Sequence, residues 1–283
     1  MLNSDKKKFV DAMLSKENHT EFQFPEKLYK FISLNNDTVL DSKIATFENK
    51  QVYLSSPLYF NDPYDCQLNM TLVNSMDDFL KLGMNRKERR IVKMKSKIRK
   101  EIEKETVDLQ EEISKDWNNF RSKMLICCFT ESWDNFLMWS HYASTYNGIC
   151  VEYDVQELLQ CKKMPMPVLY TDKLIATKDY LTKQDFYKAE PEVMYKAGIY
   201  AVLSKHLSWS YENEWRLIEI EDFIMDGKVC ELPKPSAIYF GQNLDREIKE
   251  RLIEKSNKLE IPNLYDVKIS DNQYKLIREE VRI

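Results

Sequence analysis

The sequence has 283 residues, of which 43% are hydrophobic and 12% aromatic, and its formal net charge is −4. This apolar content is enough for a large core and excludes a disordered chain, while the length still suits one domain. There are only five glycines and neither a GxGxxG nor a Walker A pattern, which argues against a Rossmann or P-loop nucleotide fold. We therefore predict one domain over residues 1–283.

The composition also predicts a location. No apolar run has the length that a bilayer span needs, and residues 1–8 are too polar for a signal peptide. The six cysteines lack the spacing of a disulfide framework, and three scattered histidines without a CxxC motif do not indicate a metal site. We expect a cytoplasmic protein with no metal and no membrane contact.

The first part of the chain predicts short helices and strands before a turn-rich loop. Ser4 suits the N-cap of a helix over residues 4–16, and residues 28–32 and 51–54 have the aromatic and β-branched content of strands. A polar turn and a short helix that ends near Ile44 are expected between those strands. Residues 60–65, Phe-Asn-Asp-Pro-Tyr-Asp, then predict a loop.

Residues 75–123 differ from the rest of the chain and predict a helical insertion. They contain no proline, one glycine (Gly83) and dense charge, which fits two helices joined near Gly83. Between Arg86 and Lys100 there are nine Lys or Arg residues and one glutamate. Such a run is typical of a solvated helix face with intrahelical ion pairs, and the alternative is a surface that binds nucleic acid or another polyanion.

The remaining chain returns to the pattern of a core, with strands and helices in irregular alternation. The predicted strands cover residues 124–129, 149–153, 214–220, 229–232, 237–240, 264–269 and 274–277. The predicted helices cover residues 135–142, 186–206 and 245–256. Strands at both ends of the chain with helices between them favour an α+β fold. We predict a mixed, mostly antiparallel central sheet with flanking helices and an inserted helical hairpin.

The strongest candidate for chemistry is the segment Tyr-Glu-Asn-Glu-Trp-Arg at residues 211–216. Strand alternation would place Glu212 and Glu214 on one face and Trp215 on the other. Two carboxylates are costly to bury, so they either lie at an exposed strand edge or line a polar cleft. In the first case Arg216 pairs with an acid elsewhere. In the second, one carboxylate binds a hydroxyl while the other orients a nucleophile or stabilises positive charge.

Two further segments are weaker candidates. His141 lies between Ser140 and Tyr142 on a short aromatic helix, where it is either a core histidine or a ligand contact, since no nucleophile motif accompanies it. In the 60–65 loop, Asn61 and Asp62 either cap turns through their own backbone or present polar groups to a ligand.

Together these segments resemble a bacterial family known as domain of unknown function 2971. The resemblance covers nearly the whole chain and is weakest over residues 75–123. Its motifs are the strand that begins at Leu28, the 60–65 loop and a Cys-Phe-Thr-Glu strand at residues 128–131. Met-Trp-Ser-His-Tyr-Ala at 138–143, Gly-Ile-Cys at 148–150 and the 211–216 segment complete them. The family name implies no activity.

The order of parts is also similar, more distantly, to the ADP-ribosyltransferase superfamily, which implies that NAD is the substrate. By position Glu214 would be the catalytic residue, with Glu212 before it. The resemblance and the loop together suggest seven contacts to the nucleotide: Tyr29, Lys30, Tyr53, Ser55, Asn61, Asp62 and His141. The first strand lacks the His or Arg of that superfamily, and its Ser-Thr-Ser is absent, so the analogy is one of order and residue type.

Three functions stay open on the sequence. The first is an NAD-consuming transferase or glycohydrolase; because NAD loss harms a cell, a toxin or phage-defence role would suit it. The second is a non-enzymatic binding protein in which the acidic and aromatic motifs are structural. The third is an enzyme that acts on nucleic acid, with the basic helix as the backbone contact and a metal held by Asp62, Asp65, Glu152 or the glutamate pair.

Overall fold

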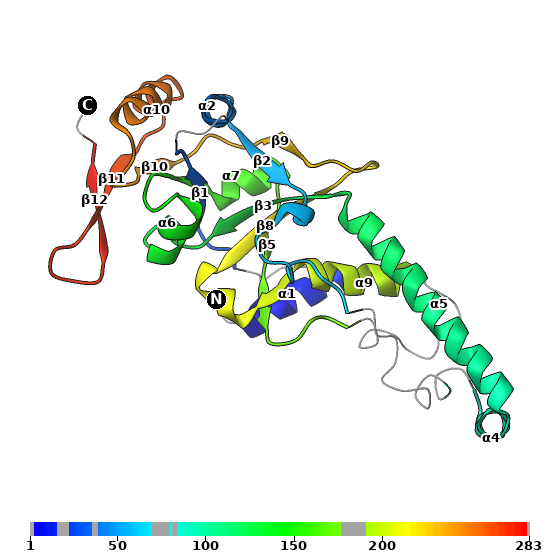
Figure 1. Ribbon diagram of the computed structural model, residues 1–283. Helices are drawn as coiled ribbons and strands as arrows, with labels where there is room; N and C mark the ends of the chain where they lie inside the picture. Colours follow the sequence, from blue (N-terminus) through cyan, green and yellow to red (C-terminus); the bar gives the residue numbers. More distant parts are fainter. Residues whose placement is uncertain are drawn as a thin grey trace.

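A computed structural model describes residues 3–15, 23–35, 39–69, 80, 84–176 and 191–281 of the chain. Its centre is a ten-stranded sheet in these residues, with the order β12-β11-β10-β4-β1-β3-β2-β9 and with β8 and β5 branching from β3 (Figure 1). Of the strand pairs in this sheet only β10 and β11 run parallel. This confirms the predicted α+β class with a mostly antiparallel sheet.

The strands are short, and all except β5, which was not predicted, overlap their predicted positions. They are β1 (Lys27–Ser33), β2 (Gln51–Ser55), β3 (Met124–Thr130), β4 (Gly148–Asp154), β5 (Met166–Pro167), β8 (Glu214–Ile220), β9 (Gly227–Glu231), β10 (Ala237–Phe240), β11 (Leu264–Ile269) and β12 (Leu276–Glu280). Strand β3 is buried along almost its whole length, which explains its continuous apolar sequence.

Helices cover both faces of the sheet. On one face the side chains of Leu125, Cys127 and Phe129 pack with three helices. These are α2 (Leu40–Glu48), α7 (Val155–Gln160) and α10 (Arg246–Lys258). The opposite face has three more, which are α6 (Phe136–Tyr142), α9 (Pro191–Val202) and the end of α5 (Ser96–Arg121). Helix α1 (Asn3–Ser15) packs with α9 through Phe9 and Val10.

The inserted hairpin is formed by α4 (Arg86–Met94) and α5. The helices join at Lys95; the expected junction near Gly83 lies outside the described residues. Figure 1 shows α5 leaving the body of the protein with α4 at its far end. At the near end the indole of Trp117 packs against Gly198 of α9, where a Cβ would come within 2.7 Å of the ring.

The long helix predicted over residues 186–206 is shorter in the structure. Residues 186–190 are outside the described part, and α9 ends at Val202. Strand β7 (Ser204–His206) follows and pairs in parallel with β6 (Leu169–Thr171). Here long-range pairing overrides the local helical pattern. No helix in the described ranges has the length and apolar character to cross a bilayer.

Candidate functional site

Five charged side chains form one buried network on the sheet face that carries α6 and α9. They are Asp65, Lys205, Glu212, Glu214 and Arg216, with exposed fractions between 0% and 6%. They come from the loop after β2, from β7, from the short 3-10 helix η3 (Leu207–Glu212) and from β8. Burying five charges is tolerated only when each is paired and hydrogen-bonded.

Lys205 is the centre of the acidic side of the network. Its Nζ lies 2.5 Å from Glu212 Oε2, 3.0 Å from Glu214 Oε2 and 3.7 Å from Asp65 Oδ2. The ammonium group also lies 5.0 Å from the ring centroid of Trp209. One cation therefore holds together three carboxylates from three segments.

Arg216 anchors the other side and uses its whole guanidinium group. Its Nε donates to Glu214 Oε1 at 2.7 Å, and its Nη2 donates to Asp65 Oδ2 at 2.8 Å and Glu214 Oε2 at 3.3 Å. Its Nη1 donates to the Val202 carbonyl at 2.6 Å and to Cys66 Sγ at 3.2 Å. An arginine has five N–H donors, so none is left for a ligand.

The two glutamates meet by a route that strand alternation does not describe. Glu214 begins β8, but Glu212 ends η3, and between them Asn213 adopts a left-handed backbone with φ of 42°. Asparagine tolerates this conformation better than most residues. The expectation that both carboxylates project from one strand is therefore wrong, although both reach Lys205. The prediction for Trp215 is right, because it packs on the opposite sheet face.

The surroundings push the pKa values of the two glutamates apart. Burial, followed by the charge of Glu214, raises the pKa of Glu212. For Glu214 burial also acts upward, but the charges of Arg216 and Lys205 outweigh it and hold the pKa well below its usual range. The surroundings therefore favour the ionised form of Glu214 and disfavour that of Glu212. Such a split is typical of paired acid–base groups.

Glu212 links the network to the rings of Tyr142 and Tyr211 near the surface, which we call the aromatic rim. Its Oε1 accepts a hydrogen bond of 2.5 Å from the Tyr142 hydroxyl, which the Asn61 side chain also contacts. The ring of His141 lies 6.3 Å from that of Tyr142 and 6.4 Å from that of Tyr211. His141 and Asn61 are exposed, and both flank this rim.

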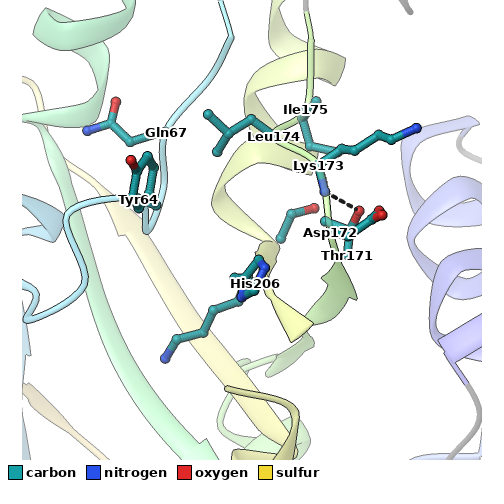
Figure 2. A pocket seen from close by; sticks show the side chains of 10 residues that line it. Tyr64, Gln67, Thr171, Asp172, Lys173, Leu174, Ile175 and His206 are labelled. Carbon is teal, nitrogen blue, oxygen red and sulfur yellow. Dashed lines mark hydrogen bonds between the residues drawn. The ribbon is translucent and has the colours of Figure 1, made fainter. Parts of the chain in front are cut away.

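A pocket of about 300 Å³ opens beside the network (Figure 2). Its lining comes from three segments: Tyr64 and Gln67, residues 171–175, and residues 204–206. In Figure 2 Tyr64 and Gln67 face Leu174 across the opening, and His206 lies below. Lys205 belongs to both the lining and the network. The volume is at the lower end of small-molecule sites.

Two of the predicted contacts lie on strand β1 and point in opposite directions. Tyr29 pairs in register with Thr130, which in turn pairs with Glu214, so the three share one face and Tyr29 is about 10 Å from Glu214 by strand spacing. The Tyr29 hydroxyl is hydrogen-bonded to Glu152. Burial, followed by the charge of Glu152, raises the pKa of Tyr29. Lys30 lies on the other face, over the ring of Phe129.

Three other predicted contacts lie after or within β2. Tyr53 is 51% exposed and its ring covers Gly227 of β9 rather than the network. Ser55 pairs with Ile126 of β3. Ile126 lies four residues from Thr130, so the two are about 13 Å apart along the strand. Asp62 caps the turn of its own loop by accepting the Tyr64 N–H at 2.9 Å. Asp65, three residues on, is the loop residue that reaches the network.

Sequence reasoning missed Lys205 and Tyr142 as site residues and did not connect Asp65 with Arg216. The signal for Lys205 is its place directly after the uncharged run Val202-Leu203-Ser204 and seven residues before Glu212. Within the described residues no group of three or more His, Cys, Asp or Glu side chains is arranged to hold a metal ion.

The family model "Protein of unknown function (DUF2971)" matches residues 138–217. This segment of the chain is therefore similar to the DUF2971 family. No curated protein and no solved structure matches the chain in the two other comparisons.

The DUF2971 segment contains most of the network. Lys205, Glu212, Glu214 and Arg216 lie in it, as does Tyr142, and Asp65 is contributed from outside. The segment begins in α6 and ends within β8, so it holds both the aromatic rim and the glutamate pair.

Proposed function

We propose that the chain is an enzyme of the ADP-ribosyltransferase type that cleaves NAD at the network beside the pocket. The observation that carries the proposal is the pair Glu212 and Glu214, which share one lysine while their pKa values are displaced in opposite directions. An ionised carboxylate beside one that exchanges protons suits a reaction in which positive charge develops on a sugar.

The chemistry assigns a separate role to each glutamate. The bond between the ribose C1′ and the nicotinamide nitrogen breaks, and its electron pair leaves on that nitrogen. Glu214 stabilises the positive charge that develops on the sugar. An oxygen of water or of an acceptor bonds to C1′, and its proton passes to the carboxylate of Glu212.

The Tyr142 hydroxyl marks the place of a ligand hydroxyl on Glu212. It donates to Oε1, the oxygen that Lys205 leaves free, and it lies at the rim where Asn61 and His141 are exposed. A ribose hydroxyl that replaces it would satisfy the same acceptor. Tyr211 and Trp209 beside it provide faces on which a planar ring can stack.

All six cysteines are free thiols, which supports a reducing compartment such as the cytoplasm. A toxin or phage-defence role would follow from NAD loss itself and has no support of its own in the geometry.

A second function, that of a non-enzymatic binding protein, is favoured by the saturation of the network. Glu214 is 3% exposed, and every donor of Arg216 is used within the protein. In that case the ions hold four segments together, and the pocket binds a small ligand without changing it.

Nicotinamide release from NAD by the purified chain distinguishes the two functions. We expect release by wild type and a loss of about 10²–10³-fold in Glu214→Gln, because an amide keeps the shape but lacks the charge. Glu212→Gln should reduce transfer to an acceptor more than cleavage. The control is Glu231→Gln, which changes an exposed glutamate on β9 and should leave the rate unchanged.

Melting temperatures are measured on the same samples. Wild-type release equal to that of folded Glu214→Gln would contradict the enzymatic proposal. Glu214→Gln that unfolds, with no wild-type release, would establish the structural role.

A further inference from the structure

The far end of the inserted hairpin carries a concentration of positive charge that the network does not use. Of the nine Lys and Arg residues between Arg86 and Lys100, Arg99 pairs with Glu103 at 3.0 Å. Seven have no carboxylate within ion-pair distance in the part of the chain that the structure describes: the half-buried Arg89 and six others, Arg86, Lys87, Arg90, Lys95, Lys97 and Lys100. All six are exposed.

Glu88, the one glutamate between Arg86 and Lys100, takes part in the N-terminal cap of α4. Glu88 Oε2 accepts the backbone N–H of Asn85 at 2.8 Å, and the Asn85 side chain accepts the N–H groups of residues 87 and 88, which completes a capping box. The intrahelical ion pair described for this run, between Arg99 and Glu103, lies in α5 and not in α4. Acidic residues become frequent only beyond Lys100, along the shaft of α5.

The basic side chains of α4 also lie on one side of the helix. Val92 is the buried residue of α4, and at 100° per residue Arg86, Lys87 and Arg90 project from the side of the helix away from it. Since α4 stands at the end of α5, away from the sheet (Figure 1), this stripe meets a partner without obstruction from the body of the protein.

We propose that α4 and the first turn of α5, residues 86–100, bind the phosphate backbone of a double-stranded nucleic acid. Phosphates in regular array match a stripe of unpaired guanidinium and ammonium groups. The segment has no aromatic residue. Single-stranded nucleic acid is bound through stacking on aromatic rings, so the composition favours a duplex held without reading of its bases. This inference does not depend on the proposed NAD chemistry.

The test is binding of the full chain to a labelled 24-base-pair DNA duplex of random sequence. The same sequence as duplex RNA and as single-stranded DNA forms parallel arms, and vesicles with anionic lipid form a fourth. With three to four phosphates contacted, affinity for duplex should fall about 40- to 150-fold between 50 and 200 mM salt. Binding to duplex DNA, duplex RNA or both supports the proposal and names the source.

The decisive variant is the triple change Arg86→Gln, Lys87→Gln and Arg90→Gln. It should weaken duplex binding at least about tenfold at 50 mM salt and flatten the salt dependence. The matched control removes three exposed lysines elsewhere, through Lys7→Gln, Lys104→Gln and Lys115→Gln, and should stay within about twofold of wild type. Both variants carry the same net charge, so only position distinguishes them.

Four results would overturn the proposal. They are no duplex binding by wild type at 50 mM salt, equal binding by the two triple variants, binding to vesicles alone, and tighter binding to the single strand than to either duplex.

Discussion

Arg216 and Arg90 are the same residue type in opposite circumstances. Arg216 is fully buried, and five acceptor contacts surround its guanidinium. Arg90 is exposed on α4 and has no ion-pair partner among the residues that the structure describes. Desolvation separates the two cases: a buried charge needs its partners continuously, while an exposed one is solvated by water until a polyanion arrives.

The comparison extends to the regions around them. In the network the charged side chains pair with one another, and Glu212 is the member that also contacts the aromatic rim, through Tyr142. In the hairpin, Arg86, Lys87 and Arg90 have no ion-pair partner among the described residues, and Glu88 is engaged in a helix cap. Paired charges with displaced pKa values indicate a site of proton transfer or a structural clamp, while unpaired charges of one sign indicate attraction to a surface.

The largest expected effect comes from changing one arginine in each region to methionine. Arg216→Met removes one of the two buried cations that Asp65 and Glu214 share, leaves them with Lys205 alone, and should lower the free energy of unfolding by about 3–5 kcal/mol. Arg90→Met changes a solvated side chain and should stay within about 0.5 kcal/mol of wild type. Urea unfolding followed by circular dichroism measures both. Equal losses would show that the network contributes no more than a surface charge.

Acid should unfold the protein through its paired carboxylates. The pKa of Glu214 is lowered by Arg216 and Lys205, and that of Glu219 is lowered to about 2 by hydrogen bonds from Lys163 and Lys228. A lowered folded-state pKa contributes stability that is present above the unfolded value near 4.3 and is lost as pH falls through the folded value.

For Glu219 the loss between about pH 4 and pH 2 should be on the order of 2–3 kcal/mol. Urea midpoints across this range should therefore decline in wild type and less steeply in Glu219→Gln. Exposed Glu231→Gln is the control and should follow wild type. A wild-type midpoint that does not change below pH 4 would contradict the paired state of these groups.

Much of the fold follows from local pattern, because strand content and caps are local properties. The predicted bounds of residues 214–220 and 237–240 coincide with β8 and β10. The helix expected up to His206 ends earlier, because Ser204 to His206 pair with a strand more than thirty residues away. Such pairing leaves no trace in the local sequence.

The candidate site was predictable in part. The segment 211–216 identifies both glutamates, but alternation gives the wrong geometry for Glu212, since η3 and the left-handed Asn213 replace the strand there. The partner of Arg216 is Asp65, 151 residues away, and Lys205 was hidden in an expected helix end. Ion pairs at that separation depend on the tertiary fold and cannot be read from spacing.

The smallest effect expected here concerns the hydroxyl that joins the rim to the network. Tyr142→Phe removes the hydrogen bond to Glu212 Oε1, and losing a donor to a buried carboxylate costs about 1–3 kcal/mol of stability. That hydrogen bond lowers the pKa of Glu212, opposing burial, so its loss should raise that pKa further. If Glu212 accepts a proton during transfer, the acid limb of the pH–rate profile should then move to higher pH.

Tyr211→Phe is the matched control, because the Tyr211 hydroxyl has no hydrogen-bond partner within the described ranges although its ring belongs to the same rim. It should leave both the unfolding free energy and the acid limb unchanged. A stability loss in Tyr142→Phe without a shifted acid limb would mean that Glu212 only holds the segments together. A shifted limb in both variants would mean that the pKa of Glu212 responds to the loss of either hydroxyl, and not specifically to the hydrogen bond from Tyr142. A shift in Tyr142→Phe alone would assign that control to the hydroxyl and connect the aromatic rim to proton transfer.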